Sequence, residues 1–292
     1  MNGFLTELGK QLAQKWLTLL VLPGLLYTAT AAFAYAAGWS HALRVHSTIA
    51  ALNALAVSEP HPQPVTIAVA ASAVLLAATA SGLAAQALSS VVETIWLGSW
   101  PTPLHRLSEA LTRRRLTKWT PIDAQNREHR RLTGMEDPVL VRQRRRIALS
   151  EPRHPTWMAD RLEAVTETVK DEYQQLDLSI AWPRLWLLIP NAVRDEVRAG
   201  RSAVDQATVL AAWGLLYAAL GVLWWPALLI GAVVAFTAWR QARARVSVYA
   251  DLIESVVDLH YTSLAAAIVP DNEENGQQLR GERLNRRLVK SR

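Results

Sequence analysis

The longest uncharged stretch of the chain predicts a pair of membrane helices. From Gln206 to Trp239, 34 consecutive residues carry no charge, and Trp224-Trp225-Pro226 lies in their middle. A helix needs about 20 apolar residues to cross ~30 Å of hydrocarbon. We therefore predict membrane-spanning helices at residues 203–223 and 226–239, joined by a very tight turn at Trp-Trp-Pro.

Two earlier apolar stretches predict a second helical hairpin. Residues 17–39 follow a short amphipathic lead-in at residues 1–16, and they form a longer apolar run than a typical signal-peptide core. Residues 65–92 are rich in Ala and Ser, which let helices approach closely in lipid, and their helical pattern continues to about residue 100. We expect residues 40–64 to form an external loop.

Residues 101–202 have a different composition and predict a helical cytosolic domain. They contain 17 Arg and 2 Lys against 14 Asp and Glu. The arginines cluster at Arg113, Arg114 and Arg115, and again in the RQRRR sequence that begins at Arg142. Cations beside a membrane are attracted to anionic lipid by roughly 1 kcal/mol each.

Helices can be placed within this basic block from apolar spacing and capping residues. We predict an amphipathic helix from Leu104 to Trp119, a short one from Pro138 to Leu149, and one from Thr156, as its cap, to Gln175. The stretch 120–155, which includes the short helix, is interrupted by prolines and is mixed in character. Glu93, the only acid in the long helical pattern before the block, is expected to pair with one of its arginines.

The segment Leu176–Pro190, LDLSIAWPRLWLLIP, is too short and too interrupted to span a bilayer. One interpretation places it at the membrane surface, with Trp182 and Trp186 at headgroup depth and Arg184 at the phosphates. The other interpretation makes it a buried linker between cytosolic helices. The sequence leaves both open.

The chain beyond the last span continues as an amphipathic cytosolic helix at residues 240–269. Asp251, Glu254 and Asp258 share one side of it, where they form a solvated face or ion pairs with the Arg-rich block. Residues 270–292 are polar and basic, and we expect a disordered tail.

The distribution of cations predicts the topology. The lead-in, the block 101–202 and the segment after Trp239 are rich in cations, whereas residues 40–64 contain Arg44 alone. The positive-inside rule then places both termini and the basic block in the cytosol of a bacterial cell, with four spans in its inner membrane. The predicted fold class is an all-α membrane protein of two hairpins with a helical cytosolic domain inserted between them.

Several classes of chemistry are missing from the sequence. There is no cysteine, no Gly-rich phosphate loop and no serine-hydrolase or zinc-protease motif. Apart from Asp205 at the start of residues 203–223, the predicted spans contain no Asp, Glu, Lys, Arg or His, which disfavours active transport. We nominate no catalytic, metal or cofactor residue and expect no cofactor.

The stretch LDLSIAWPRLWLLIP, the Trp-Trp-Pro turn and Val256-Val257-Asp258-Leu259-His260 resemble uncharacterised actinobacterial-type multi-pass membrane proteins. The resemblance covers roughly residues 157–268. It implies a membrane location and no particular activity.

These observations favour a membrane-anchored interaction or regulatory protein that presents a basic helical module at the inner leaflet. Its partners would be anionic lipids, a cytosolic protein or a second copy of the chain, and nucleic acid is disfavoured because no recognition motif accompanies the arginines. The alternative is an oligomeric channel-like or membrane-perturbing protein, such as a conflict effector; an enzyme acting on lipid ranks third. The candidate lipid or partner contacts are Arg113, Arg114, Arg115, Arg142, Arg144, Arg145, Arg146, Trp182, Arg184 and Trp186.

Overall fold

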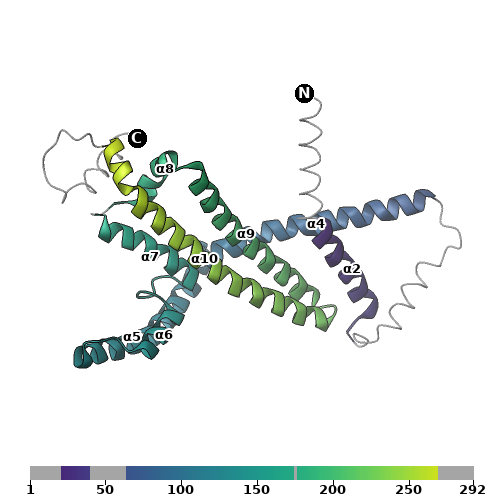
Figure 1. Ribbon diagram of the computed structural model, residues 1–292. Coiled ribbons are helices and arrows are strands. Elements are labelled where there is room, and N and C mark those ends of the chain that lie inside the picture. Colours follow the sequence, from purple (N-terminus) through teal and green to yellow (C-terminus); the bar gives the residue numbers. More distant parts are fainter. Residues whose placement is uncertain (1–20, 40–63, 174–175, 269–292) are drawn as a thin grey trace. The chain divides into compact units, whose positions relative to one another are not determined.

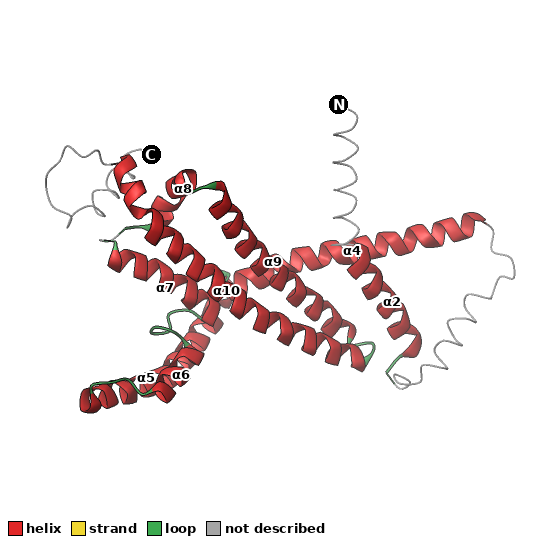
Figure 2. Ribbon diagram, in the orientation of Figure 1, coloured by secondary structure: helices red, strands yellow, loops and turns green. Residues whose placement is uncertain are grey.

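The computed structural model describes residues 21–39, 64–173 and 176–268. Over these ranges the chain forms eight α-helices, one short 3-10 helix and no strand, which confirms the all-helical prediction (Figure 1, Figure 2). The predicted lead-in, most of the external loop and the basic tail lie outside the described residues. The elements are α2 (Leu22–Ala37), α4 (Pro64–Trp96), η2 (Thr102–Leu104), α5 (His105–Thr133), α6 (Pro138–Ile147), α7 (Trp157–Glu172), α8 (Leu178–Leu188), α9 (Asn191–Leu220) and α10 (Trp225–Ile268).

The chain divides into two compact units. One comprises Met1–Val92 and Ala207–Arg240, and we call it the apolar unit; the other comprises Glu93–Gln206 and Gln241–Arg292, and we call it the charged unit. The division falls inside α4, α9 and α10, so each of these helices contributes to both units.

Glycines set the close helix packing of the apolar unit. A Cβ atom on Gly24 of α2 would lie 2.0 Å from the carbonyl oxygen of Ala78 in α4, so only glycine allows this crossing. A Cβ atom on Gly214 would lie 2.7 Å from the backbone nitrogen of Ala235, which brings α9 and α10 equally close. Without a hydrophobic force between helices in lipid, such contact is a main source of helix association.

Aromatic side chains join α2 to the α9–α10 hairpin. The Tyr27 ring contacts Trp213 and Tyr217, at centroid distances of 5.9 and 5.3 Å. Farther along α2, Phe33 meets Trp224 edge-on at 5.4 Å. These edge contacts suit the aromatic quadrupole, and they order the end of the apolar unit that contains the α9–α10 turn.

The charged unit has its own hydrophobic core. Buried side chains of α7, α8, the start of α9 and the second half of α10 meet there: Val165, Val169, Leu176, Ala181, Leu185, Ile189, Val197, Ala250, Val256, Val257, Leu264 and Ala265. The predicted α7 is confirmed, including its cap, because the Thr156 hydroxyl accepts from the Ala159 N–H at 3.2 Å.

A left-handed glycine ends the α4 segment. Gly98 has φ of +84°, and an added Cβ would lie 2.8 Å from that of Ala159. The tight turn leaves the Trp96 carbonyl oxygen to accept from the Thr156 hydroxyl at 2.5 Å. Gly98 is therefore required both by the backbone and by the space beside α7.

Two described helices, rather than four, are long and apolar enough to cross a membrane. They are α4, whose most apolar window is 11% buried, and α9, with 44%. The described part of α2 has 16 residues, and α10 reaches Arg240 after 15 residues, or about 22 Å at 1.5 Å per residue. The finer prediction of four spans is therefore not established by helix length.

Several predicted boundaries need correction. Helix α5 does not stop at Trp119 but continues through Pro121 to Thr133. Residues 226–268 lie in one helix, α10, as expected from the helical pattern that continues past the last span. Helix α9 begins at Asn191 and continues without a break through residue 203, where the predicted span starts. The turn between α9 and α10 occupies Gly221–Trp224, just before Trp-Pro, because Pro226 is well placed within the first turn of a helix.

Candidate functional site

Helices α5 and α6 lie side by side as a hairpin, residues 105–147, which we call the basic hairpin (Figure 1). Gly134, with φ of +77°, ends α5 and donates to the Arg130 carbonyl at 2.9 Å. The Asp137 side chain caps α6 by accepting from the Val139 N–H at 2.7 Å. The buried Asn126 side chain in turn accepts from the Asp137 N–H at 3.1 Å, which fixes the connection between the helices.

Ion pairs hold the hairpin together and attach it to α7. Arg144 donates to Asp123 at 2.7 Å across the two helices. Arg115 donates to Asp160 at 2.5 Å and to the carbonyl oxygens of Ile147 and His154 at 2.6 and 2.5 Å. A guanidinium with three such acceptors is held in one geometry.

Asp160 is the centre of this attachment. Its side chain is 5% exposed, and its second oxygen accepts the backbone N–H groups of Arg153 and His154 at 3.0 and 2.8 Å. A buried carboxylate is tolerated only when paired and hydrogen-bonded, and here both oxygens are engaged. The basic hairpin is thus fixed to α7 rather than being a loose arm.

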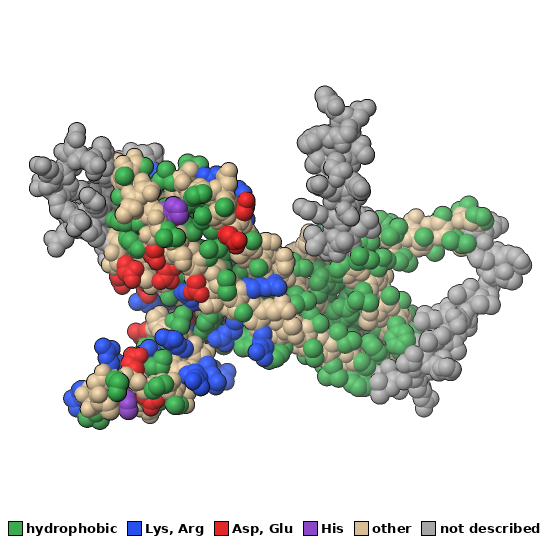
Figure 3. All heavy atoms as spheres, viewed as in Figure 1, with side chains coloured by type: hydrophobic (Ala, Val, Ile, Leu, Met, Phe, Trp, Pro, Cys, Tyr) green, Lys and Arg blue, Asp and Glu red, His purple; other side chains and the backbone are tan. Residues whose placement is uncertain are grey.

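Charge is distributed very unevenly within the charged unit. Residues 105–147 contain 12 Lys and Arg and five Asp and Glu, a net charge of +7. The remaining described residues of this unit contain nine cationic and 14 acidic side chains, a net charge of −5. On the face drawn in Figure 3, blue side chains gather over α5 and α6.

The predicted arginines separate into two groups. Arg115 and Arg144 are engaged by Asp160 and Asp123, so their guanidinium groups serve the attachment of the hairpin. The side chains of the others reach solvent: Arg113, Arg114, Arg142, Arg145 and Arg146. Their role as partner contacts stays a prediction, restricted to these five.

The segment 176–190 is partly buried, as the linker interpretation expects, and its placement at a membrane surface stays a prediction. It contains α8, which continues through Pro183, and its Leu185 is buried in the core of the charged unit. On its other side Leu187 is 75% exposed. Trp182 and Trp186 are half-buried, and Arg184 donates to the Ile180 carbonyl at 3.0 Å. One side of α8 is therefore core, and the other remains available.

Trp182 and Trp186 form one wall of an open cavity of about 550 Å³, which we call the aromatic groove. Their rings lie 6.1 Å apart, one turn apart on α8. Arg194 holds the end of α8, because it donates to the carbonyl oxygens of Trp186 and Leu187 at 2.9 and 3.0 Å. The end of α8 that carries Trp186 is thus attached to α9.

Helices α9 and α10 complete the aromatic groove. The Arg198 guanidinium lies 5.5 Å from the centre of the Trp186 ring, within cation–π range. Arg201 forms an ion pair with Glu93, and another with Asp205 at 3.1 Å, which bears out the expectation that Glu93 pairs with an arginine of the basic block. Tyr249 closes the groove from α10.

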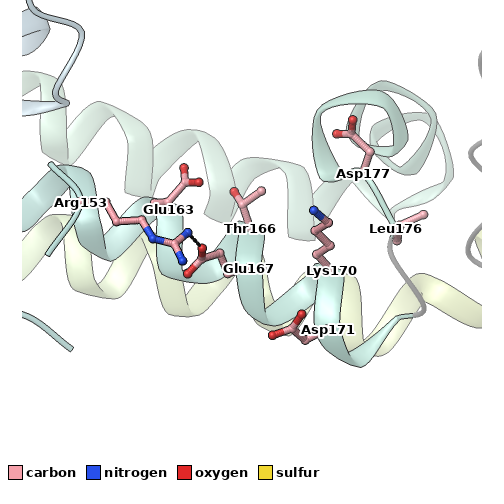
Figure 4. A pocket seen from close by; sticks show the side chains of 8 residues that line it. All are labelled: Arg153, Glu163, Thr166, Glu167, Lys170, Asp171, Leu176 and Asp177. Carbon is pink, nitrogen blue, oxygen red and sulfur yellow. Dashed lines mark hydrogen bonds and ion pairs between the residues drawn. The ribbon is translucent and has the colours of Figure 1, made fainter. Parts of the chain in front are cut away.

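A second cavity, of about 800 Å³, lies along the polar side of α7 (Figure 4). Arg153 and Glu167 point toward one another and form an ion pair across it. Lys170 and further acids complete a lining that contains both signs of charge. Over the described residues no group of three His, Cys, Asp or Glu side chains has a metal-binding arrangement, so we assign this cavity no chemistry.

The acids predicted on α10 meet partners in the charged unit. Arg161, a buried residue of α7, forms ion pairs with Asp251 and, at 3.8 Å, with Glu254. The Tyr173 hydroxyl donates to Asp258 at 2.7 Å, and burial together with this hydrogen bond raises the pKa of Tyr173 to about 12. The predicted ion pairing with the Arg-rich block is confirmed for Asp251 and Glu254.

Comparison with known proteins found no match. No protein-family model, no curated protein and no solved structure resembles the chain. The resemblance of residues 157–268 to actinobacterial-type membrane proteins therefore stays a prediction. Function has to be argued from the surfaces themselves.

Sequence reasoning missed the residues that complete these surfaces. Arg198 and Tyr249 carry no motif. Arg198 meets Trp186 because α9 packs against α8, and Tyr249 reaches the groove because α10 packs against α9. Asp160 could have been noticed as an acid in the first turn of a capped helix. Its partner Arg115, 45 residues earlier, could not.

Proposed function

We propose that the protein is a membrane-anchored interaction protein whose basic hairpin binds the anionic inner leaflet of a bacterial cell membrane. The observation that carries the proposal is the division of charge. Arg240 is the only charged residue in the described part of the apolar unit, whereas the basic hairpin has a net charge of +7. A unit without charged side chains is compatible with the hydrocarbon of a bilayer. A strongly basic hairpin is attracted to an anionic lipid surface.

The exposed apolar surface of α4 supports the membrane location. Only 11% of its most apolar window is buried, and Ile67 and Leu76 are 56% and 71% exposed. A core helix of a water-soluble protein would bury such a window. Lipid would cover these side chains without any further part of the chain.

In the finer form of the proposal, α2, α4, α9 and the first part of α10 all span the bilayer. The charge-free length of α10 falls short of ~30 Å, but Arg240, which is exposed, can extend its side chain toward the phosphates. The cation-rich regions then share one side, and both termini lie in the cytosol.

The exposed arginines of the basic hairpin are its proposed contact with lipid. Five of them, Arg113, Arg114, Arg142, Arg145 and Arg146, point to solvent, and each contributes roughly 1 kcal/mol near anionic lipid. An acidic protein is the alternative partner for the same charges.

The absence of cysteine allows a direct test. A single Gln143→Cys substitution on α6, at an exposed position between the arginines, can be labelled with a fluorophore in the full-length protein. In nanodiscs containing phosphatidylglycerol, we expect quenching by lipids that carry a quencher near the headgroup. Changing Arg113, Arg114, Arg142, Arg145 and Arg146 together to glutamine lowers the net charge of the hairpin from +7 to +2. It should remove most of the quenching, as should ~1 M salt, where the Debye length is about 3 Å.

The matched control is Glu128→Gln, which removes an exposed charge of the opposite sign from the same hairpin. It should preserve or increase the quenching. Equal quenching in nanodiscs of pure phosphatidylcholine would contradict an electrostatic contact. No quenching in either lipid would sink the lipid proposal and favour an acidic protein partner.

A further inference from the structure

The aromatic groove combines apolar walls with several donors, which is an unusual composition for a bare protein surface. Trp182, Trp186 and Tyr249 supply ring faces as well as indole N–H and phenol O–H donors. The Tyr249 phenol is a donor at neutral pH even at its ordinary pKa of 10.0, and burial raises this pKa further. A ligand that fits should pair an apolar body with an oxyanion.

Arg198 is the cation best placed to bind that oxyanion. Its guanidinium lies over Trp186, and its own ion pair with Asp195, at 3.1 Å, is exposed on both sides. Exposed pairs within a helix contribute little, so Arg198 can exchange Asp195 for a ligand at small cost. Arg201 is already engaged by Glu93 and Asp205 and serves as part of the wall.

The position of the groove along α9 indicates where the ligand comes from. Its last lining residue is Asp205, and the charge-free run begins at Gln206. Arg198 precedes that run by eight residues, which is about 12 Å of helix. If α9 enters the bilayer there, the groove lies within reach of the headgroup layer.

From this arrangement we propose that the aromatic groove binds one glycerophospholipid molecule, with its phosphodiester at Arg198 and its glycerol and first methylenes against Trp182 and Trp186. The inference rests on the proposed membrane location. It differs from the proposed action of the basic hairpin, because the groove recognises the phosphodiester common to all such lipids. The hairpin responds to the total negative charge of the surface.

Binding can be counted by native mass spectrometry of the full-length protein in detergent. The probes are dihexanoyl phosphatidylglycerol, dihexanoyl phosphatidylethanolamine and inorganic phosphate. We expect one molecule of either lipid per chain with similar affinity, and at least 10-fold weaker binding of inorganic phosphate, which leaves the aromatic wall uncovered. Arg198→Gln should weaken lipid binding about 10-fold.

Two further variants keep the test decisive. Trp186→Leu should also weaken lipid binding. If this tryptophan variant misfolds, Arg198→Gln still tests the groove, because Arg198 lies at the surface and its substitution should not disturb the fold. The control Arg106→Gln removes an exposed arginine that belongs to neither proposed lipid contact and should leave the one-to-one binding unchanged.

Four results would overturn the inference. The first is equal lipid binding by wild type and Arg198→Gln, and the second is a number of bound lipids that rises without saturation. The third is inorganic phosphate binding as tightly as the lipids, which would assign the groove to phosphate alone. The fourth is lipid binding limited to phosphatidylglycerol and lost in the hairpin variant Arg142→Gln, which would remove the groove and leave the basic hairpin as the lipid contact.

Discussion

Asp160 connects three parts of the charged unit through one carboxylate. It accepts from the Arg115 side chain of α5 and from the backbone of Arg153 and His154 before α7. Removing one partner of a buried, hydrogen-bonded ion pair leaves the other charge without compensation. The position of the basic hairpin therefore depends on a residue outside it.

We expect Asp160→Asn to lower the free energy of unfolding by about 3 kcal/mol, because Arg115 then lies beside a neutral amide. Chemical unfolding in detergent, followed by circular dichroism, measures the loss. Glu109→Gln is the control, since it breaks an exposed pair with Arg113 at 3.5 Å and should cost less than about 0.5 kcal/mol. Similar losses in both variants would mean that Asp160 has no special role.

Tyr173 makes a second prediction at this scale. Its folded-state pKa of about 12 exceeds the ordinary 10.0, so the folded protein keeps the phenolic proton longer than the unfolded chain. The associated stability is complete below pH 10 and is lost as the pH rises toward 12. In an ultraviolet titration of tyrosinate, Asp258→Ala should move one late-ionising tyrosine toward pH 10. A curve identical to that of the wild type would show that Asp258 does not hold this proton.

The sequence revealed the arginine clusters but not their separate roles. Arg113, Arg114 and Arg115 are adjacent, yet only Arg115 faces α7. Successive residues on a helix point about 100° apart, so an uninterrupted cluster must place its members on different sides. Which side is buried depends on distant residues such as Asp160, and periodicity carries no information about these.

At the scale of elements, capping residues predicted where helices begin, whereas a proline predicted a helix end that packing contacts override. Thr156 and Asp137 cap α7 and α6 near the predicted starts. Pro121 carries a local cost of about 3 kcal/mol, and it predicted an interruption that α5 does not have. Contacts on both sides of it, at Arg115 and Asp123, hold the helix straight through.

The α9–α10 hairpin yields a prediction about close packing. Gly214→Val should destabilise it by about 2 kcal/mol, because a side chain cannot fit 2.7 Å from the Ala235 backbone. Thermal unfolding in detergent should show a lower midpoint. Ala219→Val adds a comparable volume to an exposed position of the same helix and should change the midpoint little. An unchanged midpoint for Gly214→Val would mean that the two helices do not pack closely in the isolated protein.

At the scale of the whole molecule, sequence alone identified the separation of apolar and charged parts. The hydropathy and charge of a segment are sums over its own residues, so the division into apolar and charged parts can be read from the sequence before the fold is known. The number of spans did not follow, because the apolar part of α10 is shorter than a bilayer and part of α9 is buried against neighbours. The groove also escaped prediction, since three helices contribute to it.

The four-span topology predicts which side each segment occupies. A reporter enzyme that works only in the cytosol should be active when fused after Arg292, and alkaline phosphatase, active only outside, should work when fused after residue 50. Exchanging the two reporters between these positions provides the control and should abolish both signals. An active alkaline phosphatase at Arg292 would exclude an even number of spans with a cytosolic start.

The chain has a net charge of +6, but this charge is distributed unevenly. The basic hairpin has a net charge of +7, and the rest of the described charged unit has a net charge of −5. Such a separation gives the charged unit a large electric dipole. Any negatively charged support, including a cation-exchange resin, will therefore retain it in one preferred orientation, with the hairpin toward the beads. The salt concentration at which it elutes will follow the exposed cations of the hairpin more closely than the isoelectric point.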